Sequence, residues 1–119
     1  MKSSVLKEKS FNFAIRVVNI YKYLSLEKRE YVLSKQILRS GTAIGAMVME
    51  GNFAESKADF IHKFAIVQKE CNETLYWIEL LYKTQYVNNN EYLSIQNDAK
   101  ELNCLLSSSI LTAKKSLKK

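Results

Sequence analysis

Apolar side chains recur along this chain at the three- and four-residue spacing of an α-helix, in segments separated by short polar stretches. The last segment is the most regular, with apolar positions at Tyr92, Ile95, Ala99, Leu102 and Leu106. The pattern predicts helices at about residues 5–24, 26–53, 57–87 and 90–115. The lack of proline, and the presence of only three glycines among 119 residues, agrees with an all-helical chain.

The same spacing predicts which face of each earlier helix is turned to the core. These faces comprise Phe11, Ala14, Val18 and Tyr21 in the first helix, Leu33, Ile37, Ile44 and Val48 in the second, and Phe60, Phe64, Val67, Cys71, Leu75, Ile78 and Tyr82 in the third. Ser25, Ser56 and Asn88 are predicted to cap the second, third and fourth helices. Gly51 followed by Asn52 is a signal for the end of the second helix.

Short connections favour antiparallel neighbours, so the expected fold is all-α, an antiparallel up-down-up-down four-helix bundle. We expect a single domain over residues 1–119 with short basic termini. Because the number of helices is even, both chain ends should lie at the same end of the bundle.

The formal charge of +6 is concentrated at the two ends, because residues 10–113 contain equal numbers of basic and acidic side chains. Converging lysines at one end of a bundle could contact phosphates of RNA or DNA. The candidates are Lys2, Lys7, Lys9, Lys114, Lys115, Lys118 and Lys119. The alternative is a solvated tail that only confers solubility. Repetition of the lysines in an oligomer would favour binding.

The third helix is apolar on more than its core-facing side. Its far side bears Ile66, Tyr76, Trp77 and Leu80. Large apolar side chains gathered away from the core are typical of a partner surface, so we predict a subunit interface in a homo-oligomer. The alternative is that this helix is flanked on both sides by its own bundle.

Polar side chains share one face of the second helix. We predict a structural polar network of Gln36, Arg39, Ser40 and Glu50 with Glu73 of the third helix. Counting back from the turn near residue 54 brings Arg39 within about one helical turn of Glu73 and suggests an ion pair. If both groups were buried, removal of one would cost about 3–5 kcal/mol.

Two glycines lie inside the second helix, where each costs roughly 1 kcal/mol relative to alanine. Gly41 and Gly45 therefore predict close approach of a neighbouring helix, with a kink as the alternative.

Catalytic and metal-binding constellations are not expected. Asp59 and His62 have the acid-x-x-His spacing of di-iron bundles, but such sites need two pairs and the chain has one histidine. Cys71 and Cys104 are predicted to be buried thiols rather than a disulfide. The sequence thus predicts no enzyme, no metal, no cofactor and no small-molecule substrate. With no signal peptide and no membrane-spanning run, we expect a cytoplasmic protein.

The stretches SKQILRSGTAIGAMVMEG and SKADFIHKFAIVQKECNETLYWIELL, between Ser34 and Leu81, resemble the bacterial 23S ribosomal RNA intervening-sequence family, often labelled ribosomal-protein-like. The matching positions are Gln36, Arg39, Ser40, Ile44, Gly45, Glu50, Phe60, Lys69, Glu70, Asn72, Glu73 and Trp77. Ala43 and Met47 depart from the pattern, which usually has Ser and Asn there. The polar face of the second helix therefore lacks two of the polar side chains that the family pattern has there.

The resemblance implies an antiparallel four-helix bundle and, as in some members, a ring-like homopentamer. A similar pentameric bundle is the accessory protein of diversity-generating retroelements, which works with a reverse transcriptase and nucleic acid. By analogy, nucleic acid or a nucleic-acid-handling protein is the expected partner. The competing expectation is a protein–protein adaptor that binds no nucleic acid.

Overall fold

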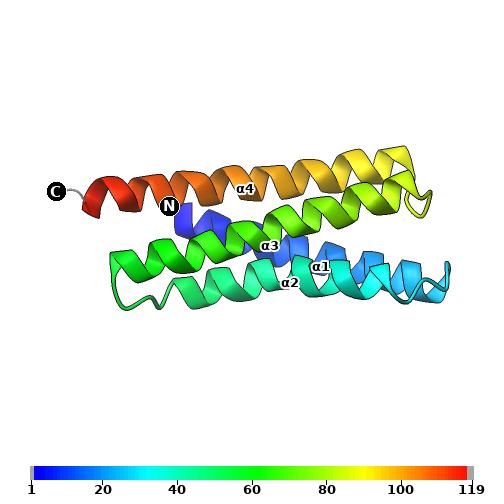
Figure 1. Ribbon diagram of the computed structural model, residues 1–119, viewed down its shortest axis with the longest axis horizontal. Coiled ribbons are helices and arrows are strands. Elements are labelled where there is room, and N and C mark those ends of the chain that lie inside the picture. Colours follow the sequence, from blue (N-terminus) through cyan, green and yellow to red (C-terminus); the bar gives the residue numbers. More distant parts are fainter. Residues whose placement is uncertain (1, 118–119) are drawn as a thin grey trace.

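The computed structural model describes residues 2–117, with side chains described from residue 5 onward. In this range the chain forms four helices: α1 (Lys2–Leu26), α2 (Leu33–Gly51), α3 (Lys57–Lys83) and α4 (Asn89–Leu117). The helices alternate in direction, each packs against the next, and the body measures 52 × 22 × 20 Å (Figure 1). The predicted up-down-up-down four-helix bundle is confirmed.

The core is a continuous apolar column to which every helix contributes. Val17, Ile44, Val67 and Leu106, one from each helix, have no exposed area. The faces predicted for α2, α3 and α4 are turned inward, with Phe60, Leu75 and Tyr92 half-buried at the margins. Burial of this column at about 25 cal/mol per Å² of apolar surface is the main favourable term for folding.

The face predicted for α1 is wrong. Phe11 is 62% exposed, and Ala14, Val18 and Tyr21 are only half-buried. The side chains that enter the core are instead Leu6, Phe13, Val17, Ile20 and Leu24. Both sets have helical spacing, so periodicity alone could not choose between them.

The second helix begins at Leu33, seven residues later than predicted. Ser25 does not cap it, because Ser25 lies in the last turn of α1 and its hydroxyl donates to the Tyr21 carbonyl oxygen (2.8 Å). The chain leaves α1 through Arg29, a non-glycine residue with φ of 53°. The intervening loop has no glycine or proline to mark it in the sequence.

Glu30 caps α2 in place of the predicted serine. Its carboxylate accepts a hydrogen bond from the Ser34 backbone N–H (2.8 Å), while the Ser34 hydroxyl donates to the Glu30 carbonyl oxygen (2.7 Å). Burial raises the pKa of Glu30, but the backbone N–H groups of Ser34, Leu33 and Val32 lower it more, so the net pKa is below 4.5. The charged form therefore stabilises the folded state.

We expect Glu30→Ala to lower the free energy of unfolding by about 1 kcal/mol at neutral pH, as for loss of a helix cap. Because the folded-state pKa is depressed, this contribution is present above about 4.5 and is lost as the pH falls through the folded-state value. Urea unfolding at neutral pH and near pH 3 would measure the change. Glu27→Ala, in the same loop, is the control and should stay within about 0.5 kcal/mol. An equal cost for both variants would contradict the cap.

The remaining helix ends agree more closely with the sequence. The Ser56 hydroxyl accepts from the Asp59 backbone N–H (3.1 Å), and the Asn88 side-chain oxygen accepts from the Glu91 backbone N–H (2.8 Å), so both predicted caps are confirmed. The third helix ends at Lys83, earlier than the predicted residue 87. It ends through Gln85, whose φ of 71° places a non-glycine residue in the left-handed region.

The glycines within α2 allow α1 to approach closely, as predicted. A Cβ at Gly45 would lie 3.2 Å from the Ser10 carbonyl oxygen of α1, and one at Gly41 would lie 2.7 Å from a Val17 methyl carbon. Close helix packing therefore explains both glycines.

Candidate functional site

The two chain ends lie at the same end of the bundle, as predicted, and α4 extends further than α1 (Figure 1). Lys7, Lys9, Lys114 and Lys115 are exposed. The structure of Lys118 and Lys119, and the side chain of Lys2, lie outside the described residues.

The lysines of the two ends are not gathered into a single cluster. Lys9 Nζ lies 2.9 Å from Glu101 Oε1 of α4, and this contact raises the pKa of Lys9. Between Glu101 and Lys114 there is about 20 Å of helix at 1.5 Å per residue. Lys9 therefore belongs to the seam between α1 and α4, where Arg16 also contacts Asp98 (2.8 Å) and Glu91 (3.3 Å).

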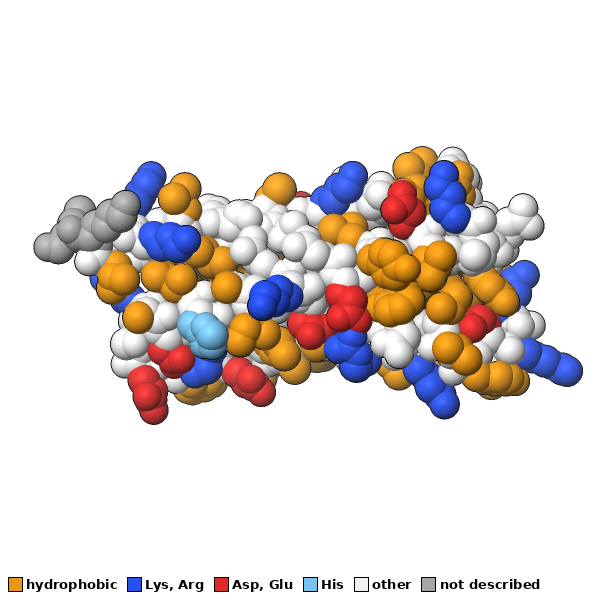
Figure 2. Space-filling view, viewed as in Figure 1, with side chains coloured by type: hydrophobic (Ala, Val, Ile, Leu, Met, Phe, Trp, Pro, Cys, Tyr) orange, Lys and Arg blue, Asp and Glu red, His pale blue; other side chains and the backbone are white. Residues whose placement is uncertain are grey.

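A lysine that the sequence did not single out joins the C-terminal group. Lys57, in the first turn of α3, hydrogen-bonds through Nζ to the Ser116 hydroxyl of α4. We call Lys57, Lys114 and Lys115 the basic end. Figure 2 shows basic side chains on the α4 side of this end and acidic ones along the opposite edge. The antiparallel packing of α3 and α4 brings Lys57 to the last turn of α4, which carries Lys114 and Lys115, and no motif in the sequence predicts this contact.

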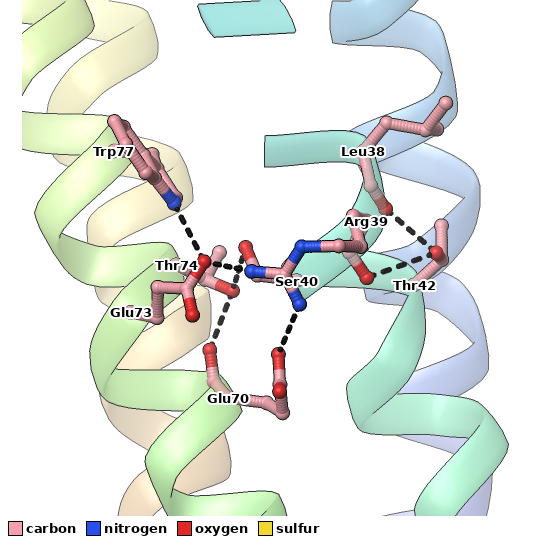
Figure 3. A network of polar contacts seen from close by, with 8 residues as sticks. All are labelled: Leu38, Arg39, Ser40, Thr42, Glu70, Glu73, Thr74 and Trp77. Atoms are coloured by element: carbon pink, nitrogen blue, oxygen red, sulfur yellow. Dashed lines mark hydrogen bonds and ion pairs between the residues drawn. The ribbon is translucent and has the colours of Figure 1, made fainter. Parts of the chain in front are cut away.

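A polar seam joins α2 to α3 near their middle (Figure 3). Arg39 extends from α2 between two carboxylates of α3 and contacts Glu73 and, at 3.2 Å, Glu70. The Trp77 indole N–H also donates to Glu73 (2.9 Å). The indole N–H lowers the pKa of Glu73, burial raises it, and Arg39 lowers it further, so the net pKa is below 4.5.

Beneath this pair lies a buried contact that the sequence did not predict. The Thr74 hydroxyl donates to the Glu70 carbonyl oxygen (2.8 Å) and shares a hydrogen bond with the Ser40 hydroxyl (2.9 Å). Both hydroxyls have no exposed area. Within the described residues, Gln36 and Glu50 do not hydrogen-bond to the polar seam. The geometry is that of a structural network that fixes the register of two helices.

The predicted Arg39–Glu73 contact is present, and the condition for the larger cost, burial of both groups, is not met, since the Arg39 side chain is 52% exposed. We therefore expect a coupling energy of about 0.2–1 kcal/mol, as for exposed ion pairs, rather than the larger cost of a buried pair. A double-mutant cycle with Arg39→Ala and Glu73→Gln, followed by urea unfolding, measures it. The glutamine keeps an acceptor for the Trp77 N–H. Strictly additive effects of the two substitutions would argue against the pair.

The predicted interface residues lie along the outer edge of α3 next to α2. Tyr76 is 58% exposed, whereas Ile66, Trp77 and Leu80 are half-buried. Trp77 also packs against the core and meets Tyr76 edge to face, with ring centroids 5.0 Å apart. Figure 2 shows apolar side chains gathered on this face toward the loop between α3 and α4.

The two positions that depart from the family pattern are half-buried on α2. Met47 packs against the core cluster. Ala43 and Met47 present no polar group there, so the polar seam is confined to the levels of Arg39 and Ser40.

The titratable side chains elsewhere suggest no metal centre. Among residues 2–117, no group of three or more His, Cys, Asp or Glu side chains could hold a metal ion. Cys71 is buried, its thiol donates to the Ala99 carbonyl oxygen (3.3 Å), and burial raises its pKa to about 11. Cys104 is exposed, so the prediction that it is buried is wrong, although both thiols are free as expected. None of the helices in the described range has a stretch long and apolar enough for a membrane span.

The protein is thus a small antiparallel four-helix bundle in which polar contacts of the seam join α2 to α3. A model of the 23S rRNA-intervening sequence protein family matches residues 2–108. The chain therefore belongs to this family, as the resemblance of its helical stretches predicted.

A solved structure supports the same assignment. It is the crystal structure of a protein with unknown function from the S23 ribosomal protein family of Bacteroides thetaiotaomicron VPI-5482, with 55% sequence identity and a TM-score of 0.91. The similarity covers 92% of this chain and 98% of that one. No curated protein matches the chain. Nothing in these similarities indicates catalysis.

Proposed function

We propose that this protein is a non-enzymatic, homo-oligomeric scaffold that associates with nucleic acid through its basic end. The observation that supports this most is the Lys57–Ser116 contact, since it holds a lysine of α3 against the last turn of α4, which carries Lys114 and Lys115. Residues 10–113 contain equal numbers of basic and acidic side chains, so the excess positive charge that would attract phosphate comes from the chain ends, which include Lys114 and Lys115.

Assembly strengthens the proposal because it multiplies the basic end. A single group of lysines gives weak, salt-sensitive binding. Several copies held in one particle bind the same polyanion with a raised effective concentration. The apolar edge of α3, with Ile66, Tyr76, Trp77 and Leu80, is the surface through which we propose that subunits associate.

The binding test is a fluorescence-anisotropy titration of structured RNA and of duplex DNA at several salt concentrations. The intact protein is compared with Lys114→Gln/Lys115→Gln and with a charge-matched control, Lys35→Gln/Lys100→Gln, whose lysines are also exposed. The first variant should bind more weakly. For duplex DNA, the slope of log K against log salt concentration should become shallower by roughly 0.9 for each phosphate contact removed. The control should behave like the intact protein.

Two outcomes would overturn the nucleic-acid proposal. The first is no binding by the intact protein at low salt, which would favour a protein–protein adaptor. The second is an equal loss of affinity in both double variants, which would show that binding depends on the net charge of the protein and not on the basic end.

The interface proposal makes its own prediction. Leu80→Glu should lower the particle mass toward the 13.8 kDa of a single chain, because a carboxylate would be desolvated against an apolar partner surface. Leu111→Glu, at a 55% exposed position of α4, is the matched control and should keep the assembly. Light scattering coupled to size exclusion measures both. If Leu80→Glu and Trp77→Ala both retain the intact mass, this edge of α3 does not join subunits.

A further inference from the structure

The aromatic residues of this chain are sorted along the length of the bundle. All seven tyrosines lie within residues 21–31 and 76–92, whereas all five phenylalanines lie within residues 11–13 and 53–64. The antiparallel topology brings the tyrosine ranges together at the end opposite the chain termini (Figure 1). Tyrosine, unlike phenylalanine, presents both an aromatic face and a polar group to a wet surface.

A groove opens at this end between α1 and the junction of α3 with α4. It consists of two adjoining hollows of about 370 and 320 Å³ in the described part of the chain, which share Tyr23, Val87 and Asn88. Volumes of roughly 300–1,000 Å³ are those of ligand pockets. The groove is therefore large enough for a nucleotide-sized group and too small for a folded partner. We call it the tyrosine groove.

The aromatic lining comes from two sides. Tyr23, 44% exposed, lies on α1, and Tyr82 and Tyr86 come from the end of α3 and the following loop. The Tyr82 ring stacks on Tyr92 at a centroid distance of 4.1 Å and an interplanar angle of 8°. The Tyr82 hydroxyl also donates to the Asn89 side chain (3.1 Å), which fixes the ring. The Tyr82 ring is therefore held in place on the α3 side of the groove, opposite the more exposed Tyr23 of α1.

Cations lie beside the same rings. Lys28 Nζ is 5.8 Å from the centroid of Tyr23, and Lys83 Nζ is 5.9 Å from the centroid of Tyr82. Glu91 is the carboxylate that lines the groove, and it lies 3.3 Å from Arg16, a second lining cation. Arg16 is already paired with Glu91 and Asp98, so the lining cation that an entering phosphate would meet is Lys28.

The polar lining suits the edges of bases. Asn19, Gln85 and Asn88 contribute side-chain amides, which both donate and accept hydrogen bonds. Aromatic rings, amides and interleaved cations are the elements with which proteins bind unpaired bases. In a duplex the faces of the bases are stacked on one another and cannot contact the tyrosine rings. A polyanion without bases would contact the cations but would have nothing to stack on the rings.

We propose that the tyrosine groove binds unpaired nucleotides of a single-stranded nucleic acid, with a base stacked on Tyr23 and its phosphate near Lys28. This site is distinct from the basic end, which lies at the other end of the bundle, and it does not depend on the function proposed for those lysines.

The test is the affinity of the intact protein for a twelve-nucleotide oligouridine, measured by fluorescence anisotropy. A duplex of the same length and free uridine monophosphate serve as competitors. Tyr23→Ala should weaken binding of the oligonucleotide by roughly five- to a hundred-fold, the range for loss of one base–aromatic stack. Tyr23→Phe keeps the ring and should bind within about twofold of the intact protein. Phe53→Ala, an 82% exposed aromatic at the opposite end, should have no effect.

Each alternative result decides against the proposal. Unchanged affinity in Tyr23→Ala, or equal loss in Phe53→Ala, would show that the groove is not the site. In the Lys114→Gln/Lys115→Gln background, competition by the duplex as strong as by the single strand would exclude recognition of unpaired bases. Competition by uridine monophosphate at the concentration of the oligonucleotide would indicate a mononucleotide site instead. Lys114→Gln/Lys115→Gln separates the two proposals, because it should weaken duplex binding and leave the effect of Tyr23→Ala unchanged.

Discussion

Phe64→Ala should lower the free energy of unfolding by about 3–5 kcal/mol, the range for removal of a fully buried phenylalanine ring. Phe64 is 1% exposed, lies in the first half of α3 and meets the Phe60 ring at a centroid distance of 4.1 Å. Its ring also fills the space over Gly51 at the end of α2. Truncation would therefore leave a cavity between two helices and a loop.

Urea unfolding at one fixed protein concentration measures this effect, since self-association would otherwise shift the apparent stability. The control is the same substitution at Phe53, which is 82% exposed and should change stability by less than about 0.5 kcal/mol. A loss below about 1 kcal/mol for Phe64→Ala would contradict the burial of this ring between α2 and α3.

Gly51→Ala should destabilise the protein by roughly 1–3 kcal/mol, as for an overpacked core position. Helix propensity alone gives the opposite sign, because alanine in a helix is about 1 kcal/mol more favourable than glycine. A Cβ at Gly51 would lie 2.3 Å from Cε1 and 2.8 Å from Cδ1 of Phe64. A buried aromatic ring cannot withdraw from such a contact without displacing its neighbours.

The two substitutions test each other. In the Phe64→Ala background the added methyl group would enter vacated space, so Gly51→Ala should become neutral or stabilising there. The double-mutant cycle of Phe64→Ala and Gly51→Ala should therefore show a large coupling energy. Helix propensity cannot produce this coupling, because it would favour alanine at position 51 equally in both backgrounds. Equal effects of Gly51→Ala in both backgrounds would show that the ring is not what requires the glycine.

Most of the fold could be predicted from the sequence because helix periodicity is local. The start of α2 could not be predicted, because residues that seldom mark a helix start stand where glycine and a serine-type cap are usual. Arg29 takes the left-handed turn that glycine usually takes, and Glu30 caps the helix from before its first residue. The inward face of α1 was also beyond prediction, since Phe11 and Phe13 belong to equally regular stripes.

The polar seam could be predicted in part for a related reason. A short turn between α2 and α3 fixes their relative register, so Arg39 could be matched to Glu73 by counting. Thr74 and Glu70 were missed, because a threonine inside a helix usually bonds its own backbone and gives no sign of a partner. The Lys57–Ser116 contact joins residues far apart in the sequence, and only the packing of α3 on α4 brings them together.

We propose that this bundle works as an assembly, because association would bury the apolar edge of α3 and repeat the basic end in one particle. The most direct test is the mass of the intact protein by sedimentation velocity over a wide concentration range. We expect a single species at an integer multiple of 13.8 kDa that persists on dilution. A mass of one chain at every concentration would show that the protein does not assemble.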